Sequence, residues 1–465
     1  MFFTTQRLTL FVISIALFMD TLDSNVLNTA VPVMSHAFDV NPIDLKIALI
    51  SYLLSIAIFI PTSGWTADKY GAKPIFIGAL GFFTVSSFFC GYAHTLVELI
   101  IARFAQGIGG AFMISLGRLI IARTFQRHEF VRMMSFVIMI VSLGVMVGPY
   151  VGGVIVDYLS WHWIFWVNIP IGFFVMILAI YYLKDTTIKS PRPFDFIGFV
   201  LFGGGLSLLC FSLSEMSESH FNARIVFLQI VIAVLMVILY VIYARRHTHP
   251  LIQLHYFSIP TFRVSVLGNI FSRLGFGGIP FLFPLFQQVS LGFNPQLSGI
   301  LLLPIALGII VAKLTSLRVL RKLGYRNFLL MNTVLVSGAL LLFQIINLQT
   351  PPYVIALLTF VYGIFISMQY TGMNSLALAD IPKEKLSAST SITSTVQMLA
   401  QSFGVAAGAI LLEIFGSGIQ HALSVAVFHH VFFALSMITL ASGFIFLTLT
   451  KESGQQMLMR TEEKI

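Results

Sequence analysis

The sequence predicts an all-α integral membrane protein with fourteen transmembrane helices. Of its 465 residues, 57% are hydrophobic and only 10% are charged, whereas a soluble domain carries about 25% charged residues. The apolar residues form continuous runs of about 20 residues, the length that an α-helix needs to cross a bilayer. Strands of a transmembrane β-barrel are about half as long and alternate in polarity, so the runs predict helices.

The fourteen elements follow directly from these runs, because a helix satisfies every backbone polar group locally inside hydrocarbon. The first run is longer than the apolar region of a secretory signal and has no small-residue cleavage site, so we interpret it as a permanent span. The predicted spans are residues 8–32, 45–65, 74–93, 95–121, 131–155, 163–183, 195–215, 223–243, 261–290, 296–316, 327–346, 353–378, 387–415 and 426–450.

The lysines and arginines predict the orientation of the chain. With the N-terminus in the cytoplasm, 21 of the 27 basic residues fall in cytoplasmic segments, and only Lys46 and Arg224 fall on the opposite face. This bias predicts that both termini are cytoplasmic, which requires an even number of spans. The net charge of +9 therefore indicates membrane topology, and we expect no nucleic-acid partner.

An internal repeat predicts the domain organisation. Two cytoplasmic loops resemble each other, and Gly324 in the second follows Gly71 in the first by 253 residues. The same shift carries Leu8, which begins the first span, to Thr261, which begins the ninth. Two parallel six-helix bundles with an inserted central hairpin explain this pattern. We expect domains at 1–183, 184–260 (proline-bearing linkers around the hairpin), 261–450, and a cytoplasmic tail at 451–465.

No cofactor or metal is expected. The glycine-rich runs 107–110 and 203–205 lie within spans, follow no strand and precede no GK[ST] sequence, so they do not indicate nucleotide binding. Cys90 and Cys210 lie far apart in apolar runs, which favours a packing role. We therefore predict that the protein is not an enzyme and does not use ATP.

Two acidic residues in the first span are the main candidate site. A charge near the bilayer centre costs roughly 2.5–3.5 kcal/mol on insertion scales, so such residues usually face a cavity or a partner. Asp20 and Asp23 share one helix face, and Asn28 lies close to it. Two adjacent buried carboxylates cannot both ionise easily, which suits proton exchange. The alternative is a structural carboxylate locked to a buried arginine.

Arginines within other spans supply possible partners. Arg103 lies in the fourth span, and Arg273 lies near the middle of the ninth. For Arg273, an ion pair inside the bundle and a direct substrate contact remain equally good interpretations. Polar residues that we expect to line a substrate cavity are Asn28, Asn269, Arg273, Gln369, Tyr370 and Asn374.

Two further patterns predict packing and gating. Gly144, Gly148 and Gly152 form one smooth stripe, which permits a close helix contact, and Pro149 should kink the helix. The stripe is explained equally by plain helix packing and by a seal against proton leakage. In the loop after the second span, Gly64 permits close approach, Asp68 caps a helix or pairs with a cation, and Gly71 allows a tight turn.

Five ordered motifs carry a resemblance to the major facilitator superfamily, in particular to its fourteen-helix drug–proton antiporter branch and the multidrug exporters of enterobacteria. The matching stretches are Leu22–Pro32, Gly64–Lys73, Arg103–Gly110, Gly144–Gly153 and Trp161–Pro170. Asp23 matches the first-helix motif, whereas many relatives are neutral at Asp20. The family usually has arginine at His162.

The resemblance implies a function for these residues. Asp23 and Arg103 would take part in proton coupling, the Asp68 loop would latch the cytoplasmic side, and the glycine stripe would mark an antiporter. We expect Asp23→Asn to abolish drug resistance with normal membrane expression.

We therefore expect a proton-coupled exporter of small amphipathic compounds that works by alternating access, as a monomer in the inner membrane. Its partners would be the lipid bilayer, protons and a small-molecule substrate. The alternatives are export of an endogenous metabolite or siderophore, proton-coupled import, and a membrane sensor that transports nothing.

Overall fold

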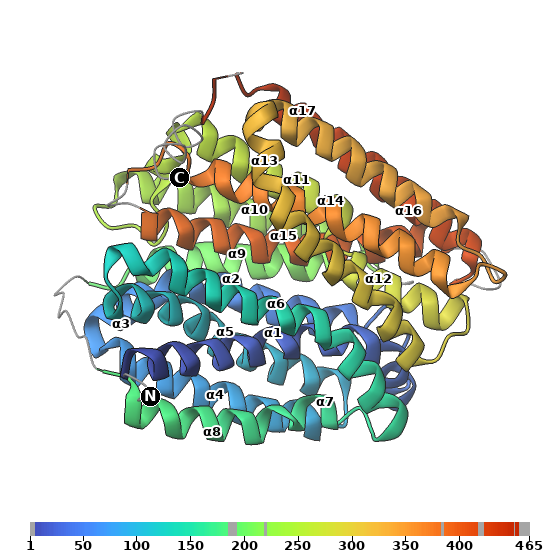
Figure 1. Cartoon of the computed structure of the whole chain (residues 1–465), viewed down its shortest axis with the longest axis horizontal. Coiled ribbons are helices and arrows are strands. Elements are labelled where there is room, and N and C mark those ends of the chain that lie inside the picture. Colours follow the sequence, from blue (N-terminus) through green and yellow to red (C-terminus); the bar gives the residue numbers. More distant parts are fainter. Residues whose placement is uncertain are drawn as a thin grey trace. The chain divides into compact units, whose positions relative to one another are not determined.

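The computed structural model describes residues 5–184, 193–217, 221–382, 386–416, 423–450 and 452–454, and every regular element in these ranges is a helix (Figure 1). The prediction of an all-helical fold is confirmed. The chain forms two compact units, Met1–Phe199 with Asn294–Gly299, and Val200–Phe293 with Ile300–Ile465. The finer division into 1–183, 184–260, 261–450 and 451–465 stays a prediction.

The first unit is built from long helices that pack side by side. Helix α1 lies against α6 and α8, α4 against α5 and α8, and α2 against α5. Its helices are α1 (Thr5–Phe38), α2 (Lys46–Phe59), α3 (Ser63–Tyr70), α4 (Ala72–Tyr92), α5 (Leu96–Thr124), α6 (Arg127–Tyr158), α7 (Trp163–Trp166) and α8 (Asn168–Tyr182), with a 3₁₀ turn at Ile60–Thr62.

The second unit is organised around its own first long helix, α11, which contacts α14, α15 and α16. The first few residues of α9 and of α13 belong to the first unit. The helices are α9 (Phe196–Glu215), α10 (Ala223–Arg246), α11 (Pro260–Phe276), α12 (Ile279–Leu285), α13 (Pro295–Leu342), α14 (Pro352–Leu378), α15 (Leu386–Gly416), α16 (Val425–Ala441) and α17 (Gly443–Leu447), with short 3₁₀ or π turns at Leu254–Ser258, Phe286–Ser290 and Phe343–Ile345.

The number of spans differs from the prediction in one place. Within the described residues, 13 helices are long and apolar enough to cross a membrane, and one of them runs for 51 residues from Pro295 to Ile345. The predicted spans 296–316 and 327–346 both lie in this segment. Its backbone leaves the helical region at Gly324, with φ 71° and ψ 166°. The count of fourteen is therefore not confirmed, because the helix continues on both sides of one non-helical residue.

The two glycines that define the sequence repeat have the same backbone conformation. Gly71, between α3 and α4, has φ 96° and ψ 142°, and Gly324 has φ 71° and ψ 166°. Only glycine adopts such angles readily, because it has no Cβ. The tight turn expected at Gly71 is present, and the corresponding glycine of the second half makes an equivalent break.

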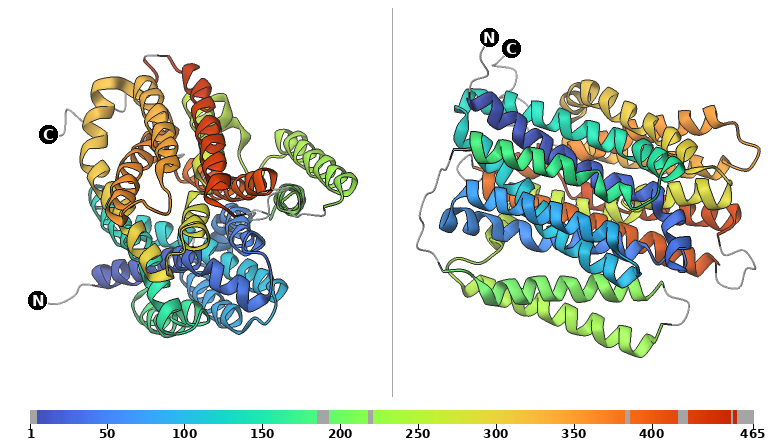
Figure 2. Two further views of the ribbon diagram at one scale, coloured as in Figure 1. Left: turned by 90° about the vertical axis from the view of Figure 1, so that its right-hand side faces the viewer. Right: turned by 90° about the horizontal axis from the view of Figure 1, so that it is seen from below.

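The predicted hairpin, α9 and α10, lies as an adjacent pair of helices (Figure 2). Met236 of α10 packs against Gly204 and Gly205 of α9. Tyr240 of α10 is buried in a core with Phe262 of α11 and several aliphatic side chains of the second unit. Its hydroxyl accepts a hydrogen bond of 2.8 Å from the backbone N–H of residue 252. The hairpin is thus anchored in the second unit by buried apolar contacts.

Two predicted segments lie mostly outside the described residues. They are the linker from Lys184 to Pro193 and the tail at 451–465.

Candidate functional site

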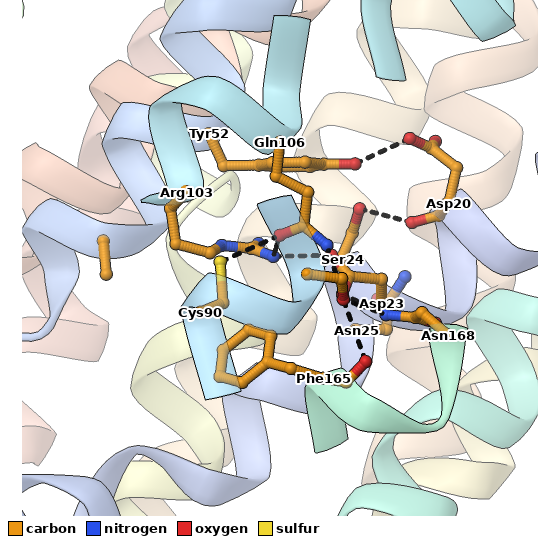
Figure 3. A network of polar contacts seen from close by, with 12 residues as sticks. Asp20, Asp23, Ser24, Asn25, Tyr52, Cys90, Arg103, Gln106, Phe165 and Asn168 are labelled. Atoms are coloured by element: carbon orange, nitrogen blue, oxygen red, sulfur yellow. Dashed lines mark hydrogen bonds and ion pairs between the residues drawn. The ribbon is translucent and has the colours of Figure 1, made fainter. Parts of the chain in front are cut away.

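The first unit contains an ion pair that is completely buried. Asp23 of α1 is 2% exposed and Arg103 of α5 is 0% exposed. Arg103 Nη1 donates to Asp23 Oδ2 at 2.5 Å (Figure 3). Breaking such a pair by removing one partner leaves a buried charge without compensation, which is strongly destabilising. For Asp23, the contacts therefore match the alternative stated for the first span, a structural carboxylate locked to a buried arginine.

Two amide side chains complete the surroundings of Asp23. Gln106 Nε2 and Asn168 Nδ2 donate to Asp23 Oδ1 at 3.0 and 2.7 Å. The same two nitrogens also lie 3.1 Å from Ser87 Oγ, and Gln106 Oε1 accepts from Arg103 Nη1 at 2.7 Å. Four helices, α1, α4, α5 and α8, thus hold one carboxylate. These hydrogen bonds fix the carboxylate of Asp23. Arg103 is paired through Nη1, while its Nε and Nη2 are buried without an acceptor among the described residues.

Asp20, one helical turn before Asp23, is held differently. Its side chain is 5% exposed, and Oδ1 accepts a hydrogen bond of 2.6 Å from the hydroxyl of Tyr52 on α2 (Figure 3). Among the described residues, no Lys, Arg or His nitrogen lies within 4.0 Å of its carboxylate. Asp20 is therefore a buried carboxylate with one hydrogen-bond donor and no ion pair.

A glycine makes room for this carboxylate. A Cβ added to Gly110 of α5 would lie 2.5 Å from Asp20 Oδ1 and 3.2 Å from the Tyr52 hydroxyl. Any larger side chain would therefore displace one of these groups. The glycine-rich run of α5 thus serves close packing.

Tyr52 connects the two acidic residues. While its hydroxyl donates to Asp20, its ring face lies 4.1 Å from the Arg103 guanidinium carbon. A cation over an aromatic face is attracted to the ring electrons. A change in the charge of Asp20 is consequently felt by the Arg103–Asp23 pair through one intervening side chain.

Several members of this network were not among the predicted site residues. Gln106 and Asn168 lie inside motifs quoted for the family resemblance, so their position was a usable signal. Tyr52 and Ser87 carry no signal in the sequence, because serine and tyrosine are common in spans. Cys90, predicted to be a packing residue, is buried, and its Sγ lies 3.5 Å from Gln106 Oε1. Asn28 is buried, at 7% exposed.

The glycine stripe of α6 faces the helix that carries both acidic residues. Added Cβ atoms at Gly144 and Gly148 would lie 3.0 Å from the backbone oxygen of residue 18 and 2.7 Å from Asn25 Cβ. At Gly152 the added atom would meet the side chain of Thr29, whose hydroxyl also donates to the Pro149 carbonyl at 3.2 Å. The predicted close helix contact is therefore present and lies between α1 and α6.

The loop after the second span contains an ion pair near its surface. Asp68 on α3 accepts from Arg123 Nη2 on α5 at 3.1 Å, and the Asp68 side chain is 43% exposed. Of the two roles predicted for Asp68, the structure has the pairing with a cation. No heavy atom of the described chain lies within 4 Å of a Cβ added to Gly64, so the close approach expected there is not seen.

The second unit has a contrasting arrangement around Arg273 of α11. Arg273 Nη1 donates to Gln401 Oε1 on α15 at 2.9 Å, and the guanidinium lies 4.3 Å from the ring centre of Tyr370 on α14. Among the described residues no carboxylate oxygen lies within 4.0 Å of it. The bundle-interior ion pair that the sequence left open for Arg273 is therefore not found there.

The other predicted cavity residues divide into two groups. On α14, Asn374 accepts a hydrogen bond from Gln397 of α15 at 2.6 Å, one helical turn from the pair of Tyr370 and Gln401. Asn269 is buried on α11, one turn before Arg273. Gln369 instead accepts from Asn332 of α13 at 2.8 Å and is 1% exposed. Gln369 therefore belongs to helix packing between α13 and α14.

His162, where the family usually has arginine, is stacked on Trp161, with ring centroids 3.9 Å apart. Partial burial lowers the pKa of His162, and the nearby His94 lowers it further. The lowered pKa favours the neutral imidazole, and its stacking on Trp161 suits an aromatic packing role.

A family model described as the Major Facilitator Superfamily matches residues 13–405 and 267–458. The chain is 32% identical over 463 residues to "Putative multidrug resistance protein MdtD" of Escherichia coli K12 and of Shigella boydii serotype 18, with 99% of this chain and 98% of each relative covered.

Solved structures share the fold. A D-xylose–proton symporter superposes with a TM-score of 0.69 at 14% identity, covering 96% of this chain and 98% of the symporter. A point mutant of the nucleoside transporter NupG superposes with a TM-score of 0.65 at 14% identity, covering 95% of this chain and 99% of the other.

Proposed function

This chain belongs to the major facilitator superfamily, and we propose that it is a proton-coupled exporter of small amphipathic compounds. It is a multi-pass membrane protein with the fold of known transporters. The relatives named for multidrug resistance support the choice of drugs as substrates. In the proposed arrangement the protein works as a monomer in the inner membrane with both termini in the cytoplasm, and the proton gradient supplies the energy without a cofactor.

The single observation that carries this proposal is the environment of Asp20. The carboxylate is 5% exposed and has a hydroxyl donor but no cation beside it. An isolated buried charge is costly, and binding a proton removes that cost. The two oxygens of Asp23 accept hydrogen bonds from Arg103, Gln106 and Asn168, so the charge of this carboxylate already has partners. Asp20 is therefore our choice for the residue that carries the coupled proton.

The neighbouring ion pair supplies a means of coupling. While Asp20 is ionised, Arg103 interacts with negative charge on Asp23 and, across the Tyr52 ring, on Asp20. Once Asp20 binds a proton, the second attraction is lost, and α1, α2 and α5 no longer have the same electrostatic interaction. A conformational equilibrium shifts only when its states differ in such interaction energies. Proton binding from outside and substrate binding from the cytoplasm would then favour different states of the alternating-access cycle.

Everted membrane vesicles test this proposal. ATP-driven acidification of the vesicle interior is followed by addition of ethidium, chloramphenicol or fusidate, which are cationic, neutral and anionic amphipathic compounds. We expect at least one of them to dissipate part of the pH gradient in vesicles with wild-type protein. Asp20→Asn should lose this response completely at an equal amount of membrane protein. A full response from Asp20→Asn would remove Asp20 from coupling, and a wild type that responds to none of the compounds would contradict antiport.

A matched pair of glycine variants tests the geometry without changing a titratable group. Gly110→Ala places a methyl group where the Asp20 carboxylate lies, and overpacking of this kind costs typically 1–3 kcal/mol. The vesicle response should fall severalfold. Gly78→Ala on α4 adds the same methyl group where no heavy atom lies within 4 Å, and it should respond like the wild type. Equal responses from the two variants would show that the position of Asp20 is unimportant.

A further inference from the structure

Arg273 is a buried cation in the middle of a membrane span. It is the fourteenth residue of the 31-residue span Pro260–Ser290, and its side chain is 8% exposed. Near a span end, a long basic side chain reaches the water interface, but a mid-span position does not allow this. Within the described chain no carboxylate pairs with it. Arg273 thus carries a positive charge at mid-span with no acidic side chain to balance it. This indicates that the balancing anion is not one of the described side chains.

The guanidinium plane is held on two sides. Gln401 Oε1 accepts from Nη1 at 2.9 Å, and Gln401 Nε2 is itself fixed by the backbone oxygen of Gly277 at 2.6 Å. The ring of Tyr370 covers one face of the guanidinium at 4.3 Å. Tyr370 in turn meets Phe276 edge-on, with ring centroids 5.5 Å apart. The orientation of Arg273 is therefore set before any ligand binds, which lowers the entropy lost on binding.

One edge of this fixed plane is left without a partner. Arg273 Nε is buried with no hydrogen-bond acceptor, and Nη2 has none among the described residues either. Nε–H and the adjacent Nη–H of an arginine form the parallel pair of donors that a carboxylate binds with both oxygens. The occupied nitrogen, Nη1, is the one outside this fork. The contacts thus use the face of the guanidinium and its Nη1, and they leave the donor pair of Nε and Nη2 without an acceptor.

The surrounding polar groups are neutral. Gln397 Nε2 donates to Asn374 Oδ1 at 2.6 Å, and both side chains are half-buried one turn from Gln401 and Tyr370. On α11, the buried Asn269 uses its amide nitrogen on its own helix, at 3.1 Å from the Ser265 oxygen. Amides can orient a polar ligand without adding charge. The net charge of this cluster is therefore +1, which a single carboxylate would balance.

We propose that Arg273, held by Gln401 and Tyr370, binds the carboxylate of an anionic amphipathic substrate. This inference rests on the proposed exporter function and names its substrate class. A carboxylate matches the planar donor fork and the single positive charge, whereas a phosphate dianion would remain half-compensated. The half-buried ring of Tyr370, which Phe276 supports edge-on, supplies apolar surface for the rest of an amphipathic molecule.

Fluorescence titration of the purified full-length protein tests the subsite directly. The probes are dansylglycine, which carries a carboxylate at pH 7.5, and dansylglycinamide, its neutral analogue. We expect the wild type to bind dansylglycine roughly tenfold to hundredfold more tightly, the range for a charge-assisted hydrogen-bond pair. Arg273→Gln should bind both probes equally. Arg273→Lys should keep part of the preference, because it retains the charge but loses the fork.

Arg318→Gln is the matched control, since it removes one exposed positive charge from the same unit. It should keep the full preference for dansylglycine. Arg273→Gln should also unfold at the same temperature as Arg318→Gln or higher, because it breaks no ion pair. Inorganic phosphate should displace dansylglycine no better than acetate at equal ionic strength.

Several outcomes would overturn the subsite. The first three are that the wild type binds the two probes equally or binds neither, that Arg273→Gln keeps the full preference for dansylglycine, or that Arg318→Gln loses it. The other two are that phosphate displaces dansylglycine better than acetate does, or that Arg273→Gln alone severely destabilises the protein. None of these measurements needs a gradient. A protein that prefers the carboxylate probe but moves no protons in vesicles would contradict the antiport and leave the subsite intact. A protein that moves protons in vesicles but binds both probes equally would contradict the subsite and leave the antiport intact.

Discussion

Helices α1 and α11 begin the two halves of the predicted repeat, yet they carry opposite charges at corresponding positions. Arg273 follows Asp20 by 253 residues, the same distance that separates Gly71 from Gly324. Next to Asp20 the first unit adds a second acid, Asp23, together with the buried arginine that neutralises it. The described part of the second unit has neither beside Arg273. The two predicted halves thus share the backbone conformation at Gly71 and Gly324, while the polar side chains of α1 and α11 differ.

The comparison separates charges that stabilise the structure by pairing with each other from charges that remain available to bind a proton or a ligand. In the first unit, Arg103 and two amides hold the carboxylate of Asp23, so removing either member of the ion pair leaves an uncompensated charge. Asp20 and Arg273 are nearly as buried but have no ionic partner among the described residues. Replacing either one by a neutral residue removes the cost of burying an unpaired charge and breaks no ion pair. We therefore expect substitution of Asp23 to lower stability, and substitution of Asp20 or Arg273 to alter function.

The largest effect on stability is expected from Asp23→Asn. It leaves Arg103 buried without an anion, which costs about 3–5 kcal/mol, so thermal unfolding in detergent should shift to much lower temperature and membrane expression should fall. This differs from the normal expression that the motif alone predicts. The double variant Asp23→Asn with Arg103→Gln removes both charges and should recover part of the loss. A single variant as stable as wild type would contradict the buried ion pair and erase the contrast with Arg273.

An intermediate effect is expected at the two glycines that the halves share. Gly71→Ala and Gly324→Ala each force a side chain into a backbone region that costs of order 1–3 kcal/mol. The two unfolding temperatures should fall by similar amounts, since the conformations are similar. Gly64→Ala, in the same loop but with free space around it, should be nearly neutral. A loss at only one of the two repeat positions would show that the halves differ in backbone as well as in charge.

The smallest effect is expected from Asp68→Asn. Its partner Arg123 is also partly exposed, and surface pairs of this kind contribute about 0–1 kcal/mol. The unfolding temperature should change little, and less at high salt. If the pair instead acts as a latch between conformations, transport in the vesicle assay should drop although stability does not. Unchanged transport and unchanged stability together would reduce the Asp68 loop to a topology signal.

Much of the site was predictable from the sequence because charge inside a span is rare and conspicuous. Asp20, Asp23, Arg103 and Arg273 were all singled out in this way. The amides Gln106 and Asn168 were less visible, because uncharged polar residues also serve helix packing. Gln369 illustrates the difficulty: it was grouped with cavity residues by polarity and position, but it bonds to Asn332 between two packed helices. Only contacts distinguish these cases.

The sequence by itself determined that this chain crosses the membrane many times and that its motifs match a known family, and it predicted an internal repeat. Hydrophobic length, glycine and charge are local properties, and each can be seen without knowing what lies opposite. Pairing was decided only by the tertiary structure. Whether a buried charge is neutralised depends on side chains brought together from distant helices, and that is why, in the described part of the chain, Asp23 has an arginine while Asp20 and Arg273 have no ionic partner.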